Sequence, residues 1–155
     1  MKLYIYTDGA ARGNPGESAS GFLILSEQKK VVVRNFFYNG TQTNNVAEYL
    51  AIIAALKKAD ADFGAGGEVE LYSDSELVVN QINGRYKVRD KRLKALHKEA
   101  IEAARRFRSC TFSNLPREDG KIAAVDRELN RLLDARERDD RAMEDLKTHG
   151  RQGRL

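Results

Sequence analysis

Cysteine, histidine and tryptophan are scarce in this sequence, which has one Cys, two His and no Trp among 155 residues. A single cysteine excludes an internal disulfide, and Cys110 lies in the apolar-leaning stretch CTFSNL, which is typical of a packed strand residue rather than a reactive thiol. His97 and His149 are too few for a His-rich zinc site. The sequence also lacks a G-x-x-x-x-G-K-[ST] loop, a G-x-S-x-G elbow and a Cys nucleophile with a positioned base.

Long hydrophobic runs are missing as well. No apolar stretch approaches the roughly 20 residues that span a bilayer. The N-terminal MKLYIYTDGA places an acid and a glycine where the apolar stretch of a signal peptide should continue. We therefore expect a cytoplasmic protein without membrane segments. With 41% hydrophobic and 32% charged residues, the chain has enough apolar material for one core and one globular domain.

Positive charge is concentrated in one segment. Residues 84–108 contain ten Lys or Arg and three acids, a net charge of +7, whereas the whole chain carries +4 and the remainder therefore −3. A local basic patch suits a polyanion backbone, because neutralised phosphates release counterions. A solvated helix face is the structural alternative.

The hydrophobic pattern changes along the chain from strand-like to helix-like periodicity. We predict strands over residues 2–6, 21–25 and 31–38, a helix of about four turns from Val46, a strand over 68–73, helices over 76–82 and 90–107, a strand over 110–115 and a helix over 122–133. This order predicts an α/β fold with a mixed sheet covered by helices. Beyond Asp134 apolar residues are few, so we expect a charged extension over 135–155, partly helical and then disordered.

Three acidic residues could serve either in catalysis or in local structure. Asp8 ends the first predicted strand and precedes a glycine, which is typical of a turn. Glu48 follows Asn45 by three residues, the spacing of a capping box. Asp74 lies in the run Ser-Asp-Ser-Glu, where Ser73 and Glu76 would cap a helix.

A fourth acid, Asp126, lies among apolar positions in the body of the last predicted helix, where it needs a partner. The ends of two neighbouring strands and two covering helices would bring all four carboxylates to one edge of the sheet. Such a cluster is repulsive and raises its own pKa values unless cations neutralise it, and oxygen ligands suit Mg²⁺ or Mn²⁺. We therefore predict a Mg²⁺ site.

Four strings of residues together resemble type 1 ribonuclease H. They are YTDGA with RGNPG (residues 6–10 and 12–16), TNNVAE (43–48), YSDS (72–75), and PRE with AVD (116–118 and 124–126). The resemblance covers about residues 1–134, which it identifies as the catalytic domain. It implies a five-stranded mixed sheet in the order 3-2-1-4-5, with helices on both faces.

The activity that this resemblance implies is endonucleolytic hydrolysis of the RNA strand of RNA–DNA hybrids, leaving 5′-phosphate and 3′-hydroxyl ends. The family's four acidic ligands fall on Asp8, Glu48, Asp74 and Asp126. Two Mg²⁺ ions, with Mn²⁺ as a possible substitute, would lie about 3.5 to 4 Å apart and share Asp8 and the scissile phosphate.

The same resemblance suggests how RNA is distinguished from DNA. Asn14 and Asn44 are the amides placed to contact 2′-hydroxyls, and Gly13 lets the backbone approach. Asn14 is alternatively a turn residue. Thr43 resembles part of a pocket for a DNA-strand phosphate, or it caps the following helix. The complete predicted substrate-binding set is Gly9, Arg12, Gly13, Asn14, Thr43, Asn44, Asn45, Arg85 and Lys87.

Two departures from the family pattern bear on function. Residues 116–121 contain no His, which many members carry on this loop to help product leave, and Arg117 is our candidate catalytic substitute. The long basic protrusion with Trp is also missing, so substrate grip must come from other basic residues, such as Arg85, Lys87, Arg89, Lys91 and Arg92. We expect a short form without an N-terminal hybrid-binding domain.

Two alternatives stay open: a nucleic-acid-binding module that no longer cuts, and the same fold acting on another substrate, as in transposases, resolvases and exonucleases. Because the loop His is missing, duplex RNA is worth testing beside the RNA–DNA hybrid. We expect a monomer.

Overall fold

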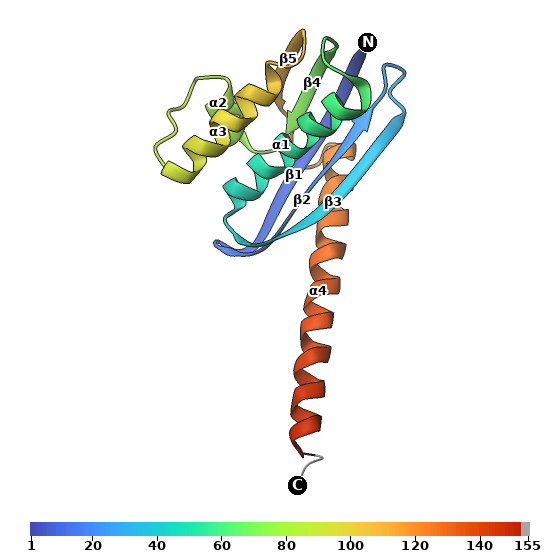
Figure 1. Cartoon of the computed structure of the whole chain (residues 1–155), viewed down its shortest axis with the longest axis vertical. Helices are drawn as coiled ribbons and strands as arrows, with labels where there is room; N and C mark the ends of the chain where they lie inside the picture. The colour runs from blue at the N-terminus through green and yellow to red at the C-terminus, as the bar shows by residue number, and fades with distance from the viewer. Residues whose placement is uncertain (153–155) are drawn as a thin grey trace.

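The computed structural model describes residues 1–152, and the last three residues of the predicted extension lie outside this range. The elements run in the predicted order of strands and helices (Figure 1). They are β1 (Lys2–Gly13), β2 (Gly16–Leu25), β3 (Val31–Gln42), α1 (Asn44–Phe63), β4 (Glu68–Ser73), α2 (Glu76–Ile82), α3 (Lys91–Ala104), β5 (Ser109–Asn114) and α4 (Gly120–Gln152).

The sheet has the order β3-β2-β1-β4-β5, which confirms the predicted order. Strands β1, β2 and β3 pair antiparallel, whereas β4 is parallel to β1 and β5 is parallel to β4. The sheet is therefore mixed, and β1 lies at its centre, between its antiparallel and parallel halves. The pairing of β1 with β4 ends at Thr7 and Ser73.

Alternating side chains of β1 and β2 belong to two separate hydrophobic cores, one on each face of the sheet. Leu3 and Ile5 belong to the core beneath α1, α2 and α3, together with Phe22 and Ile24. Tyr4 and Tyr6 pack with α4 on the opposite face. The period of two along a strand thus places helices on both faces of the sheet.

Strand β1 is longer than predicted. The prediction ended at Tyr6, and the following Asp-Gly-Ala-Ala stretch is rich in residues depleted from strands. Pairing with β2 overrides that local preference and continues from Asp8 opposite Gly21 to Gly13 opposite Gly16. Asp8 therefore lies in mid-strand and not at a strand end.

Helix α1 begins at a cap that the sequence left open. Thr43 is the N-cap, and its side chain accepts a hydrogen bond from the Val46 backbone N–H at 3.2 Å. The predicted capping box of Asn45 and Glu48 is wrong, because both residues lie inside the helix. α1 has 20 residues, more than the predicted four turns.

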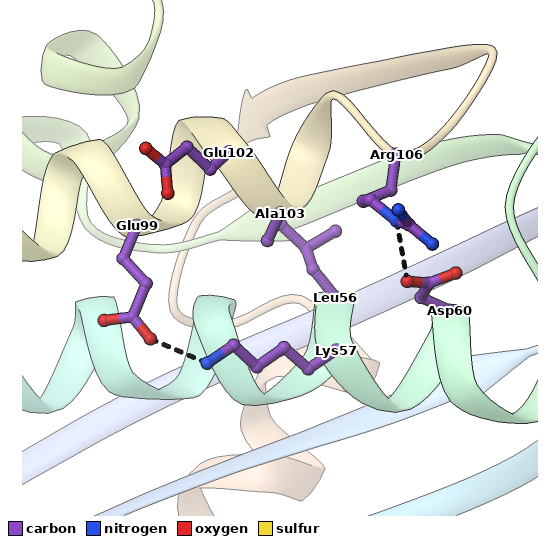
Figure 2. A pocket seen from close by; sticks show the side chains of 7 residues that line it. All are labelled: Leu56, Lys57, Asp60, Glu99, Glu102, Ala103 and Arg106. Atoms are coloured by element: carbon purple, nitrogen blue, oxygen red, sulfur yellow. Dashed lines mark hydrogen bonds and ion pairs between the residues drawn. The ribbon is translucent and has the colours of Figure 1, made fainter.

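Helix α3 packs across α1, leaving a hollow of about 380 Å³ between them. Figure 2 shows Leu56 and Ala103 meeting between the helices, with ion pairs on either side. Lys57 pairs with Glu99 at 2.7 Å, and Arg106 pairs with Asp60 at 3.0 Å. These exposed pairs each contribute about 0 to 1 kcal/mol. The hollow is thus a packing seam whose charges largely satisfy one another.

Helix α4 covers the second face of the sheet and then extends well beyond it (Figure 1). Val125, Leu129 and Leu133 are buried against β2, whereas residues 136–149 are exposed. The helix runs unbroken to Gln152, further than the predicted 122–133. The division into a catalytic domain over 1–134 and an extension stays a prediction. No helix within residues 1–152 is long and apolar enough to cross a membrane.

Candidate active site

Two acids, Asp8 and Asp74, lie next to each other near the centre of the sheet. Asp8 and Asp74 come directly after Thr7 and Ser73, the last residues that pair β1 with β4. β4 ends here while β1 continues, and because the two parallel strands are in register up to this point, Asp8 and Asp74 lie next to each other. The turn explanation for Asp8 is wrong, because β1 continues through Gly9.

Glu48 reaches the same point from α1 through a close contact between helix and strand. A Cβ added to Gly9 would lie 2.3 Å from the Ala47 carbonyl carbon and 2.4 Å from the Glu48 nitrogen. Only glycine therefore lets α1 approach β1 this closely. The contact leaves Glu48 6% exposed and Asp8 3% exposed.

Carboxylate oxygens of Asp8, Glu48 and Asp74 lie within 4.8 Å of one another. Neighbouring donors orient two of them: the Gly9 N–H donates to Asp8 Oδ1 at 2.9 Å, and the Ser73 hydroxyl donates to Glu48 Oε2 at 3.3 Å. Sequence reasoning missed this role of Ser73, although its place beside Asp74 in the YSDS string was an available clue. Ser75, not Ser73, caps α2.

The electrostatics of the cluster disfavour three bare carboxylates. Burial raises the pKa of Asp8, and the charges of Glu48, Asp74 and Asp126 raise it further. Burial also raises the pKa of Glu48, with Asp74 adding to the effect. Without a cation the protein must retain protons here, so a divalent cation relieves a real penalty. The donor set consists of carboxylate oxygens from β1, from α1 and from the turn after β4, and it fits a hard divalent ion.

Asp126 stands at the margin of this cluster. It lies half-buried on α4, and its charge contributes to the raised pKa of Asp8. It is not one of the three acids whose oxygens lie within 4.8 Å of one another. The structure thus brings three of the four predicted ligands together and holds the fourth nearby on the opposite face of the sheet.

A polar hollow of about 290 Å³ opens at the cluster, with Glu48 and Asp74 in its lining. Its lining residues are Gly9, Asn44, Asn45, Glu48, Asp74, Ser75 and Arg117. Arg117, in the turn before α4, places Nε 3.5 Å from Asp74 Oδ2, while its side chain is 79% exposed. Arg117, which the sequence suggested as a substitute for the loop histidine, therefore lies at the opening of the acidic site.

Comparison with known proteins agrees with this geometry. A family model described as reverse transcriptase-like matches residues 6–125. The N-terminal ribonuclease H domain of a Mycobacterium tuberculosis protein, solved as a fusion with maltose binding protein, superposes with a TM-score of 0.82 at 35% identity, covering 90% of this chain and 98% of that one. The chain belongs to the type 1 ribonuclease H family.

Two further family members are similar over much of the chain. Ribonuclease HI of Halobacterium salinarum is 39% identical over 116 residues, which are 75% of this chain and 57% of the relative. A ribonuclease H1 isolated from compost by a metagenomic approach, solved in complex with an RNA/DNA hybrid, has a TM-score of 0.77 at 39% identity and covers 83% of this chain and 94% of that one. The chain spans only 36% of the bifunctional M. tuberculosis protein that it also matches. Membership in the ribonuclease H family, together with the acidic cluster, indicates binding of divalent metal ions.

The predicted amides lie on the rim of the site, tied to the backbone. Asn14 Oδ1 accepts a hydrogen bond from the Asn44 backbone N–H at 3.1 Å, and Asn44 Oδ1 accepts one from the Ala11 N–H at 2.9 Å. Gly13 has a φ of 95°, a left-handed conformation that favours glycine. A second hollow of about 330 Å³ is lined by Asn14, Thr43, Asn45, Val46, Asp90, Arg92 and Leu93.

The remaining predicted substrate residues lie away from the acids. Arg85 and Lys87 are exposed on the loop between α2 and α3, where Arg85 contacts Asn80 Oδ1 at 3.3 Å. Arg12 is turned onto α4, where it pairs with Asp134 and Glu137. Because those acids already use its guanidinium donors, we leave Arg12 out of the proposed substrate contacts.

Proposed function

We propose that this chain hydrolyses the RNA strand of RNA–DNA hybrids endonucleolytically, leaving 5′-phosphate and 3′-hydroxyl ends. The observation that carries the proposal is the convergence of Asp8, Glu48 and Asp74, whose carboxylate oxygens lie within 4.8 Å of one another at the edge of a ribonuclease H sheet. The related compost enzyme, solved with an RNA/DNA hybrid, supports the choice of substrate.

Asp8, Glu48, Asp74 and Asp126 are the residues that would hold the metal, which we propose to be two Mg²⁺ ions, with Mn²⁺ as a substitute. When bound, such ions activate a water molecule and stabilise the charge that develops on the phosphate and leaving oxygen. The protein's contribution is to hold the carboxylates in place. The Gly9 N–H fixes Asp8, and the Ser73 hydroxyl fixes Glu48.

Arg117 cannot repeat the chemistry of a histidine, because a guanidinium keeps its proton at physiological pH. We propose instead that it pairs with a phosphate oxygen of the substrate or the departing product. Its position supports this role: the side chain is 79% exposed, and its Nε lies 3.5 Å from Asp74 Oδ2. A phosphate at the hollow would compete directly with that weak pair.

Recognition of RNA is proposed to rest on Asn14 and Asn44. Both side-chain oxygens accept backbone N–H groups, so the Nδ2 groups are the donors left to meet a 2′-hydroxyl. The second hollow, with Thr43 and Arg92 in its lining, suits a phosphate of the DNA strand. Thr43 can serve in both ways, since capping uses its oxygen as an acceptor and leaves the hydroxyl proton free to donate.

The deciding experiment compares wild type with Asp8→Asn on hybrid, duplex RNA and duplex DNA of one sequence, in Mg²⁺, Mn²⁺ or EDTA. We expect cleavage of the RNA strand of the hybrid, dependent on the metal, and a loss of at least about 100-fold in Asp8→Asn. The matched control is Asp62→Asn, which removes an exposed acid paired with Lys58 on α1. Undiminished cleavage by Asp8→Asn would overturn the proposal.

Three further proposals concern the substrate range, the oligomeric state and the cellular location. We propose duplex RNA as a second substrate because residues 116–121 lack the loop histidine. The cleavage assay above tests this directly. A monomeric state is tested by light scattering after size exclusion. Location in the cytoplasm is supported by the presence of only one cysteine, which is typical of proteins from reducing compartments.

A further inference from the structure

Arg12 of β1 links the sheet to the start of the α4 extension. Its Nη2 donates to Asp134 Oδ1 at 2.6 Å, and its Nη1 donates to Glu137 Oε1 at 2.9 Å. Nη2 also reaches both the backbone oxygen and Oδ1 of Asn130, each at 3.2 Å. One guanidinium thus contacts three residues on two successive turns of the helix.

Asn130 connects Arg12 to Asp126 through hydrogen bonds. Its Nδ2 donates to the backbone oxygen of Asp126 at 3.0 Å, so a continuous chain of hydrogen bonds runs from Arg12 to the residue that bears the fourth carboxylate. The spacing is the same on both elements. Asp8 and Arg12 are four residues apart on one face of β1, and Asp126 and Asn130 are four residues apart on one face of α4.

The other contacts of this stretch of α4 with the sheet are less directional. Val125, Leu129 and Leu133 pack on apolar side chains of β2, a kind of contact that tolerates small shifts along the helix. The planar fork of an arginine fixes direction as well as distance. A second support lies beside it: the Arg136 guanidinium lies 3.6 Å from the ring centroid of Tyr38, whose hydroxyl donates to Glu17, the cross-strand neighbour of Arg12.

We propose that Arg12 is a positioning residue, which sets the distance between Asp126 on α4 and the carboxylates of Asp8, Glu48 and Asp74. The inference rests on the proposed function, because it assigns Asp126 to the same metal site. It replaces the sequence-based expectation that Arg12 contacts the substrate. The ion pairs act through geometry, because partly exposed pairs of this kind contribute little to global stability.

The test measures metal binding without turnover. Mn²⁺ affinity is determined by electron paramagnetic resonance for wild type, Arg12→Ala and the double variant Asp134→Asn/Glu137→Gln, in the absence of nucleic acid. We expect both variants to bind Mn²⁺ about 10-fold more weakly and to need a correspondingly higher Mg²⁺ concentration for half-maximal cleavage. Arg131→Ala is the matched control, because it removes an α4 arginine whose partner, Glu128, is on the same helix. It should behave as wild type.

Two further measurements separate positioning from substrate contact. Binding of hybrid in EDTA should be unchanged in Arg12→Ala, whereas a lost phosphate contact would weaken binding and flatten its salt dependence. In an Asp126→Asn background, Arg12→Ala should cause no further loss of Mn²⁺ affinity, because the carboxylate that it positions is gone. Additive losses, or weakened hybrid binding in EDTA, would overturn the inference.

Folding and function are controlled separately. Thermal melts show whether each variant folds, and if Arg12→Ala does not, Arg12→Lys and the Asp134→Asn/Glu137→Gln variant decide the question. Failure of the proposed function looks different: wild type would bind Mn²⁺ but cut no hybrid. The coupling between Arg12 and Asp126 would still be measurable in the Mn²⁺ titration.

Discussion

Asp8 shows how a residue's chemistry depends on more than its neighbours in sequence. The Asp-Gly pair is typical of a turn, yet β1 continues past it and leaves Asp8 3% exposed, beside Glu48 and Asp74. Burial is the main cause of its raised pKa, and neighbouring carboxylates add to it. A buried acid whose pKa is raised in this way is a candidate for a functional residue.

The raised pKa values of Asp8 and Glu48 predict how the stability of the metal-free protein depends on pH. Asp and Glu in the unfolded chain lose their protons near pH 4, whereas the raised pKa values of Asp8 and Glu48 keep protons on the folded protein to higher pH. The folded state therefore binds more protons, and stability falls as pH rises above about 4 through the raised pKa values. We expect the Tm in EDTA to fall between pH 5 and pH 8 by several degrees.

Two additions make the melting experiment specific to the acidic cluster. Asp8→Asn should flatten the pH dependence, and Mg²⁺ should raise the Tm of wild type most at the upper end of the range. Asp62→Asn, the exposed control, should follow wild type. A pH-independent Tm in wild type would contradict the raised pKa values.

At the scale of elements, the close approach of α1 to β1 determines whether a site exists. Gly9 is the point of contact, and the neighbouring Glu48 enters the cluster because the helix backbone lies directly on the strand. The caps at Thr43 and Ser75 begin α1 and α2 beside the same sheet edge. The cluster thus combines the middle of β1, the N-terminal part of α1 and the turn after β4, and the carboxyl ends of parallel strands are a common place for sites in α/β folds.

Gly9→Ala tests this contact. Its Cβ would lie 2.3 Å from the Ala47 carbonyl carbon, so strand and helix must separate. We expect a loss of about 1 to 3 kcal/mol in the free energy of unfolding, measured by urea denaturation, and a larger proportional loss of Mn²⁺ affinity. Gly120→Ala, where an added Cβ would have no heavy atom within 4 Å, is the control. Unchanged metal affinity in Gly9→Ala would contradict this role of the contact.

At the scale of the whole molecule, charge is distributed unevenly over the fold. The segment with a net charge of +7, residues 84–108, forms the loop after α2 and helix α3, on the face of the sheet that carries α1. The α4 extension carries mixed charges along an exposed helix. A long polyanion can therefore contact the α3 side while its scissile bond lies at the acidic hollow.

Neutralising Arg85, Lys87 and Arg89 together should raise KM for the hybrid and reduce the salt dependence of binding, with kcat largely unchanged. Each lost phosphate contact lowers the slope of log K against log salt by about 0.7 to 0.9. The matched control removes three positive charges from the extension at Arg138, Arg141 and Lys147. Equal effects in both triple variants would show that net charge, and not a defined basic surface, governs binding.

The sequence by itself determined the order of elements, the two amphipathic patterns that cover the sheet and, through the family resemblance, the strand order and the three acids that the structure brings together. These features were predictable because hydrophobic periodicity and short motifs are local. Only the tertiary structure decided that β1 runs to Gly13, that Thr43 caps α1 and that Arg12 binds α4. Strand pairing and ion pairs join different elements of the chain, and Arg12 and Asp134 are 122 positions apart, so no local pattern can relate them.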